Sequence, residues 1–139
     1  MVILIDTNIL LDVLQDRKPF LCESGEVIRL CGNRSVKGYV AMHSISNIFF
    51  IMRKNCSGEQ RRLLLKGLLK IVRVSGMKHE SVVEALEREE FSDFEDCLQD
   101  ECAKEVGADY IITRNVKDFE QSKVPAITPE QFLEIMKKK

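Results

Sequence analysis

Strand-like and helical segments alternate along the chain, and this alternation constrains the fold more than any other feature of the sequence. The apolar, β-prone run 2–5 gives way to a polar turn, and apolar residues then recur at helical spacing from Ile9 to Leu14. Four further strands are expected, at 37–41, 71–74, 109–113 and 126–127. The sequence therefore predicts an α/β fold, in which a mainly parallel sheet is flanked by helices on both faces.

Capping signals mark several of the expected helices. Ser92 and Glu95 have capping-box spacing at the start of a helix that ends at Gly107, and Ser57 and Thr128 are further N-caps. On the helix from Ser92, we expect a core-facing ridge of Phe94, Leu98 and Cys102. The helical patterns cover residues 20–30, 44–53, 57–70, 81–89 and 92–107, with a single turn at 116–119.

The length favours one domain, because 139 residues is the usual size of a single hydrophobic core. We expect that domain to span 1–139, with 137–139 as a frayed tail. The longest uncharged run, 38–52, is interrupted by polar residues, so no membrane span or membrane partner is predicted. No signal peptide is recognisable, and the five cysteines form no C-x-x-C pair. We therefore expect a cytoplasmic protein with reduced thiols.

Charge is balanced overall but segregated along the chain. The net charge of −1 lacks the bulk basicity of a general nucleic-acid binder. Residues 53–78 nevertheless hold eight basic residues and one acidic residue, whereas residues 79–109 hold twelve acidic and two basic residues. This separation is compatible with a binding surface, with a metal site, or with two solvated helices.

Several carboxylates occupy positions that suit chemistry. Asp6 directly follows the first strand, where a parallel sheet presents side chains to a crevice, although Asp is also a common N-cap. Asp93, Asp96 and Asp100 share one helical stripe, which is either a solvated face or a site that a divalent cation would neutralise. Asp118 follows the expected strand 109–113 in the same way as Asp6 follows the first.

These strand ends predict one shared pocket, because the carboxyl ends of parallel strands meet at the same edge of a sheet. Asp6, Asp96 and Asp118 would supply its carboxylates. Neutral groups would come from nearby residues, namely Thr7, Asn8, Thr113 and Asn115. An oxygen-rich acidic pocket suits Mg²⁺ or Mn²⁺ better than Zn²⁺. Other chemistries lack support, because the chain has no nucleophile motif near His43 or His79 and no phosphate-binding glycine loop.

Three motifs together resemble the PIN domain family. They are Ile5-Asp6-Thr7-Asn8-Ile9-Leu10-Leu11-Asp12, Asp93-Phe94-Glu95-Asp96 and Thr113-Arg114-Asn115-Val116-Lys117-Asp118-Phe119, in this order over nearly the whole chain. The resemblance implies a parallel sheet flanked by helices, and Mg²⁺- or Mn²⁺-dependent ribonuclease activity. Many members are VapC-like toxins of toxin–antitoxin pairs, so the resemblance also implies a cognate antitoxin and a homodimer.

By this resemblance, Asp6 and Asp96 are catalytic metal ligands, with Asp93 nearby, and the turn after Thr113 supplies the last ligand. Either Asp118 reaches the metal or Asn115 occupies the place of the usual acid. The family commonly has a Glu in the helix after the second strand, where this chain has Asn47, as in a divergent branch with an S-x-x-N-I pattern. The loss of that charge would weaken metal binding.

The primary hypothesis is an endoribonuclease that hydrolyses RNA phosphodiester bonds with the help of Mg²⁺ or Mn²⁺. The candidates for contact with the substrate and its phosphate are Thr7, Asn8, Asn47, Thr113, Arg114 and Asn115. The basic helix at 57–70 would track the RNA backbone, or it is simply a solvated face. Asn47 motivates an alternative, a catalytically weak or inactive PIN fold that binds RNA or protein. A metal-dependent phosphatase or a DNA nuclease is a third possibility.

Overall fold

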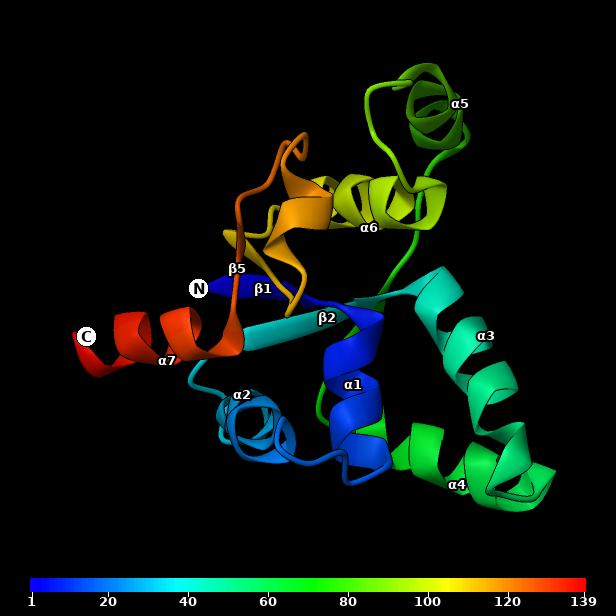
Figure 1. Cartoon of the computed structure of the whole chain (residues 1–139), viewed down its shortest axis with the longest axis vertical. Coiled ribbons are helices and arrows are strands. Elements are labelled where there is room, and N and C mark those ends of the chain that lie inside the picture. The colour runs from blue at the N-terminus through cyan, green and yellow to red at the C-terminus, as the bar shows by residue number, and fades with distance from the viewer.

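The structure, a computed structural model, describes all residues, 1–139, as one α/β domain (Figure 1). Its centre is a five-stranded sheet in the order β3-β2-β1-β4-β5, and every pair of neighbouring strands is parallel. The strands are β1 (Val2–Ile5), β2 (Lys37–Ala41), β3 (Arg73–Ser75), β4 (Tyr110–Ile112) and β5 (Ala126–Ile127). The predicted fold class, a parallel sheet flanked by helices, is therefore confirmed.

Helices connect the strands, as parallel pairing requires. The α-helices are α1 (Thr7–Leu14), α2 (Leu21–Gly32), α3 (Met42–Ile51), α4 (Gly58–Leu68), α5 (His79–Glu87), α6 (Phe94–Glu105) and α7 (Pro129–Lys137). Two 3₁₀ turns, η1 (Met52–Lys54) and η2 (Val116–Phe119), complete the chain. The expected capping boxes of α4 and α7 are present at Ser57 and Thr128. No helix has the length and apolar character needed to cross a membrane.

The sheet grows in opposite directions from its central strand. The chain first adds β2 and β3 on one side of β1, and it then returns to place β4 and β5 on the other side. Ile5 of β1 pairs with Ile112 of β4, so the residues that follow them leave the same edge of the sheet as neighbours. Such a reversal opens a crevice beyond the carboxyl ends of the strands, and ligands bind there in open α/β sheets.

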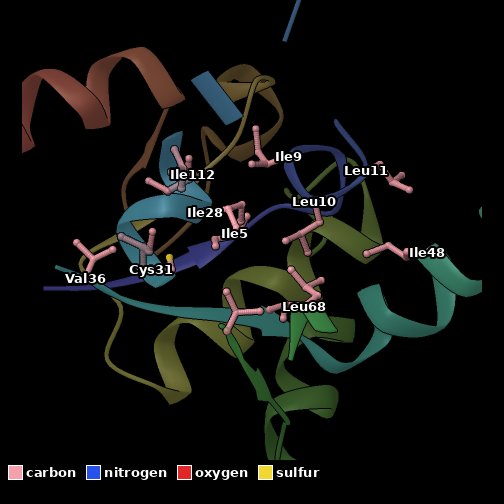
Figure 2. Packing of buried hydrophobic residues seen from close by; sticks show 14 of the residues in the cluster. Ile5, Ile9, Leu10, Leu11, Ile28, Cys31, Val36, Ile48, Leu68 and Ile112 are labelled. Atoms are coloured by element: carbon pink, nitrogen blue, oxygen red, sulfur yellow. The ribbon is translucent and has the colours of Figure 1, made fainter. Parts of the chain in front are cut away.

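Two separate cores pack against the two faces of the sheet. Ile3 and Ile5 contribute to a cluster with α1, α2, α3, α4 and α7, part of which is shown in Figure 2. Leu4 points to the opposite face and packs with residues of α5, α6 and η2. The period-2 alternation of side chains along β1 produces this division. Figure 1 shows α5 and α6 on one side of the sheet, and α1, α2 and α4 on the other.

Two glycines meet specific backbone requirements. Gly107 has a φ of +65° directly after α6, which is the left-handed position expected of a C′ residue. Gly38 lies in β2, where a Cβ would come within 2.6 Å of the Cys31 Sγ on α2. The absence of a side chain at Gly38 therefore lets α2 pack closely against the sheet.

Three local expectations were wrong. Asp93, not Ser92, is the N-cap of α6, and its side chain accepts a hydrogen bond from the Asp96 amide at 3.0 Å. Phe94 does not belong to the core ridge, because it is 44% exposed as the first residue of the helix. Asp93, Asp96 and Asp100 do not share one environment either, because Asp100 is fully buried and paired with Arg88 at 2.7 Å.

Candidate active site

Asp6 is held at the crevice by Thr113, which directly follows β4, and by Gln99 of α6. Thr113 Oγ1 donates to Asp6 Oδ2 at 2.8 Å, and Gln99 Nε2 donates to Asp6 Oδ1 at 2.8 Å. Asp6 occupies the N-cap position of α1, yet its carboxylate makes no capping hydrogen bond. The Asp6 side chain therefore does not serve as a helix cap, because both of its carboxylate oxygens accept hydrogen bonds from other residues of the crevice.

Gln99 connects Asp6 with Asp96. Its Nε2 lies 2.8 Å from Asp6 Oδ1 and 3.4 Å from Asp96 Oδ1, so one amide nitrogen serves two carboxylates. The Gln99 Oε1 atom is buried and has no hydrogen-bond partner. Asp96 and Gln99 are three residues apart on α6, and residues at this spacing share one face of a helix.

The Asp96 carboxyl resists ionisation in this setting. Burial, followed by the neighbouring charges of Asp93, Asp6 and Asp118, raises its pKa to about 7. Burial also raises the pKa of Asp6, although the hydrogen bonds from Gln99 and Thr113 oppose the shift. The carboxylates of the crevice therefore repel one another, and the neighbouring residues do not fully compensate their negative charge.

Residues of α3 face these carboxylates from the other wall. Asn47 Nδ2 donates to Glu95 Oε2 at 3.2 Å, which fixes the first turn of α6 against α3. His43 Nε2 lies 3.1 Å from the Glu95 carbonyl oxygen, which can only accept, so Nε2 carries a proton in this hydrogen bond and the neutral ring has Nδ1 unprotonated. Burial lowers the pKa of His43, which favours this neutral ring.

Together these walls enclose a pocket of about 340 Å³ at the carboxyl ends of the strands. It is lined by Asp6, Thr7, Asn8, His43, Asn47, Phe50, Ile51, Glu95, Asp96 and Gln99. Thr7 is fixed in the lining by a 2.7 Å hydrogen bond from its Oγ1 to Ser44 Oγ. The lining is therefore mainly polar and acidic, with Phe50 and Ile51 as its apolar side.

The structure brings most of the predicted site residues together. Asp6, Thr7, Asn8, Asn47 and Asp96 line the pocket. Three others lie next to it, with Thr113 bonded to Asp6, and with Asp93 and Asp118 close enough to raise the pKa of Asp96. Asn115 and Asp118 are both exposed beyond the pocket lining, and of the two only Asp118 carries a charge that acts on Asp96.

Arg114, a predicted contact residue, does not line the pocket but pairs with Asp12, although its charge opposes the rise in the pKa of Asp6. Its Nε and Nη2 atoms donate to the two carboxylate oxygens of Asp12 at 3.0 and 3.1 Å. Its guanidinium also lies 3.7 Å from the centre of the Phe20 ring. Through these contacts Arg114 connects the turn after β4 with α1 and with the loop before α2.

Five pocket residues were not predicted as site residues: His43, Phe50, Ile51, Glu95 and Gln99. His43 lies two residues beyond β2, so the rule that selected Asp6 at a strand end also applies to it. Gln99 follows Asp96 by three residues, and this helical spacing was the available signal. Glu95 was expected only as the capping-box partner of Ser92, and Phe50 and Ile51 carried no signal, because their place in the pocket depends on how α3 packs against α6.

The donor chemistry of the pocket suits a hard divalent cation. Its carboxylates are oxygen ligands of the kind that Mg²⁺ and Mn²⁺ prefer, and their mutual repulsion is what a cation would relieve. In the present arrangement no three Asp, Glu, His or Cys side chains converge as ligands, and the Gln99 amide is the group shared by Asp6 and Asp96. A cation held by both carboxylates would compete with that amide.

A parallel α/β sheet with an acidic pocket at its topological reversal defines a class of ligand-binding α/β domains. The family model described as PIN domain matches residues 2–117, which is most of this sequence. The chain therefore belongs to the PIN domain family. No curated protein matches it.

Solved structures with the same fold include proteins from toxin–antitoxin systems. VapBC2 from Rickettsia felis, bound to a promoter DNA fragment, has a TM-score of 0.72 at 15% identity, covering 92% of this chain and 98% of its own. A toxin–antitoxin complex from Klebsiella pneumoniae has a TM-score of 0.67 at 21% identity, with coverages of 91% and 96%. VapC20 from Mycobacterium tuberculosis, a toxin that cleaves the sarcin–ricin loop, has a TM-score of 0.61 at 14% identity, with coverages of 78% and 86%. At these identities the similarity establishes the fold.

Proposed function

We propose that this chain is an endoribonuclease that hydrolyses RNA phosphodiester bonds with Mg²⁺ or Mn²⁺. The observation that carries the proposal is the pair of carboxylates, Asp6 and Asp96, joined through Gln99 at the reversal point of the sheet. Membership of the PIN domain family supports the same chemistry.

In this proposal, Asp6 and Asp96 hold the cation, and Asp93 and Asp118 add negative charge around it or orient a water molecule. A bound divalent cation supplies polarisation of the phosphoryl oxygen and a lowered pKa for a coordinated water. The Thr113–Asp6 and Thr7–Ser44 hydrogen bonds hold the crevice in shape, because both are made by the protein itself and need no ligand. Such preorganisation limits the rearrangement needed at the moment of reaction.

Glu95 can compensate for the acid that α3 lacks, which is the main sequence feature against catalytic activity. Asn47 stands where the family commonly has Glu, yet its amide holds the Glu95 carboxylate at the pocket. The negative charge is then supplied from α6 in place of α3. This arrangement favours the enzyme over a catalytically inactive module that only binds RNA or protein.

The test is cleavage of single-stranded and hairpin RNAs by the purified protein in Mg²⁺ and in Mn²⁺. Asp6→Asn and Asp96→Asn should abolish cleavage while circular dichroism shows a folded chain. Glu134→Gln is the matched control, because it removes one exposed carboxylate from α7, which does not contribute to the pocket. Absence of cleavage by the wild type over many RNAs and both metals would favour the binding module. DNA and small phosphate esters in parallel reactions test the DNA nuclease and phosphatase alternatives.

We also propose that the chain is the toxin of a toxin–antitoxin pair, with an antitoxin protein as its partner and a homodimer as its assembly. Structures of VapBC and other toxin–antitoxin complexes share the fold, which supports this role. Induced expression in a bacterial host should arrest growth, and a small DNA-binding protein encoded next to the gene should relieve the arrest. Growth arrest that persists in Asp96→Asn would contradict a toxic nuclease.

A further inference from the structure

Phe50 is an exposed aromatic ring at the rim of the acidic pocket. It is 61% exposed and lines the pocket together with Asn47 and Asp96. Phe50 follows Asn47 by three residues on α3, so both side chains lie on the face of the helix that borders the pocket. Exposure of a large apolar ring to water is unfavourable, and a ring beside a polar pocket is a candidate contact for a ligand.

An arginine already stacks on this ring. The Arg53 guanidinium lies 3.7 Å from the centre of the Phe50 ring, and Arg53 Nη1 donates to the Phe50 carbonyl oxygen at 2.9 Å. This pair of contacts orients the ring while leaving more than half of Phe50 exposed. A cation over an aromatic face is a favourable arrangement that an incoming planar group can extend.

Basic residues continue outward from this ring over η1 and α4. Between residues 53 and 66 the chain has five basic residues and one acidic residue, Glu59. Arg61 and Arg62 lie over the neighbouring Phe49 ring at 4.2 and 5.6 Å, and Arg61 Nη1 donates to the Phe49 carbonyl oxygen at 2.7 Å. These contacts anchor the basic strip to the end of α3 that carries Phe50.

We propose that Phe50, with Arg53, is a stacking site for an unpaired nucleobase of single-stranded RNA, next to the phosphate that enters the pocket. Sites for single-stranded nucleic acids combine a basic track for the backbone with aromatic side chains on which bases stack. Here Phe50 lines the acidic pocket, and the basic residues of 53–66 follow it on η1 and α4. The inference rests on the proposed ribonuclease function, and it adds that the substrate is unpaired at the cleavage site.

The surroundings favour RNA over a protein on this ring. The centre of a protein interface is poor in charge, whereas Phe50 lies between the carboxylates of the pocket and a strip of unpaired basic side chains. None of the five basic residues of the strip forms an ion pair with an acidic side chain. They are Arg53, Lys54, Arg61, Arg62 and Lys66. Their charges are therefore available to phosphates.

The chain has no tryptophan, so a single substitution introduces a unique fluorescent reporter. Phe50→Trp places the reporter at the proposed site, and Leu86→Trp on α5, which is 64% exposed, is the control of matched exposure outside the pocket. Each variant is titrated with a 12-nucleotide single-stranded RNA in Ca²⁺, and intact RNA is verified on a gel. Anisotropy of a labelled copy of the same RNA reports binding independently of the tryptophan.

We expect bound RNA to quench the fluorescence of Phe50→Trp strongly and that of Leu86→Trp little. Phe50→Ala should weaken RNA binding about tenfold, and Phe50→Tyr should retain it, because stacking needs a ring and not its exact identity. Bound RNA that leaves Phe50→Trp unquenched would overturn the stacking site while leaving the ribonuclease proposal standing. A change of oligomeric state in Phe50→Ala with unchanged RNA affinity would assign the ring to a protein interface and overturn it as well. A wild type that neither binds nor cleaves RNA would overturn both proposals.

Discussion

The Asn47 amide donates to the Glu95 carboxylate across 3.2 Å and thereby joins α3 to the first turn of α6 at the rim of the acidic pocket. This contact brings a carboxylate to a wall where α3 itself offers only amide, imidazole and apolar side chains. The Glu95 position therefore depends on Asn47, although the two residues are 48 positions apart in the sequence.

If Glu95 contributes to cation binding, Glu95→Gln should weaken Mn²⁺ binding several-fold, because it removes one negative charge and keeps the shape. Asn47→Ala should weaken it less and in the same direction, since Glu95 keeps its charge but loses its hydrogen bond. Isothermal titration calorimetry with Mn²⁺ measures both effects, with Glu134→Gln as the control. An unchanged Mn²⁺ dissociation constant in Glu95→Gln would remove Glu95 from the site.

The raised pKa of Asp96 makes the metal-free protein sensitive to pH. Between the ordinary value of 3.8 and the folded value of about 7, the folded chain holds a proton that the unfolded chain has released. The contribution of this group to the free energy of unfolding therefore falls as the pH rises through this window and is lowest above pH 7. Asp96→Asn, which cannot ionise, should be more stable than the wild type at pH 8 by on the order of 1 kcal/mol, a figure reduced from the full shift because Asp96 is only half-buried and solvent screens its charge, with a smaller difference at pH 5. Urea unfolding in EDTA at both pH values checks this, and a difference that is larger at pH 5 would contradict it.

Arg114 should matter for stability more than for RNA. Asp12 is fully buried, and Arg114→Ala would leave it with only the Ser24 hydroxyl at 3.0 Å as a side-chain partner. We expect a loss of about 2–3 kcal/mol in the free energy of unfolding, somewhat below the cost for a fully buried pair because Arg114 is 24% exposed. Denaturant unfolding measures this loss. A variant of unchanged stability and reduced RNA affinity would instead support Arg114 as a phosphate contact.

Among the ion-paired residues, substitution of Arg88 is expected to lower the free energy of unfolding the most. It pairs with Asp100 at 2.7 Å and with Glu101 at 2.8 Å, and both carboxylates are almost completely buried. Arg88→Ala should cost about 3–5 kcal/mol, because it strands buried charge and Glu101 Oε1 already lacks a partner. Arg29→Ala is the control, since the Arg29–Glu26 pair is exposed to solvent and should contribute little to the free energy of unfolding. Similar losses in the free energy of unfolding of the two variants would show that burial does not make the Arg88 ion pairs more stabilising than the exposed Arg29 pair.

The sequence predicted the features that depend on local order. Alternating strands and helices fix a parallel sheet, and parallel register then places the residue after β1 beside the residue after β4. This is why Asp6 and Thr113 could be expected in one pocket before their hydrogen bond was seen. The sheet topology confirmed the α/β class, and the match to the PIN domain family model confirmed the resemblance.

The features that escaped prediction depend on contacts between distant segments. Arg114 reaches Asp12 across 102 positions, and no local pattern reports that pairing. For His43 and Gln99 the sequence offered only their spacing from β2 and from Asp96, and the packing of α3 and α6 is what shows that both line the pocket with Asp6. The cap of α6 was misplaced by one residue because Ser92 and Asp93 are both good N-cap residues and only the backbone decides between them.

The most direct test of the central claim is the anomalous scattering of a crystal soaked in millimolar Mn²⁺. The account predicts an anomalous peak between Asp6 and Asp96, with carboxylate oxygens of both residues about 2.1 Å away. Asp96→Asn crystals treated in the same way should lose or weaken that peak. Wild-type crystals without a peak at these carboxylates would contradict a metal-dependent active site in this pocket.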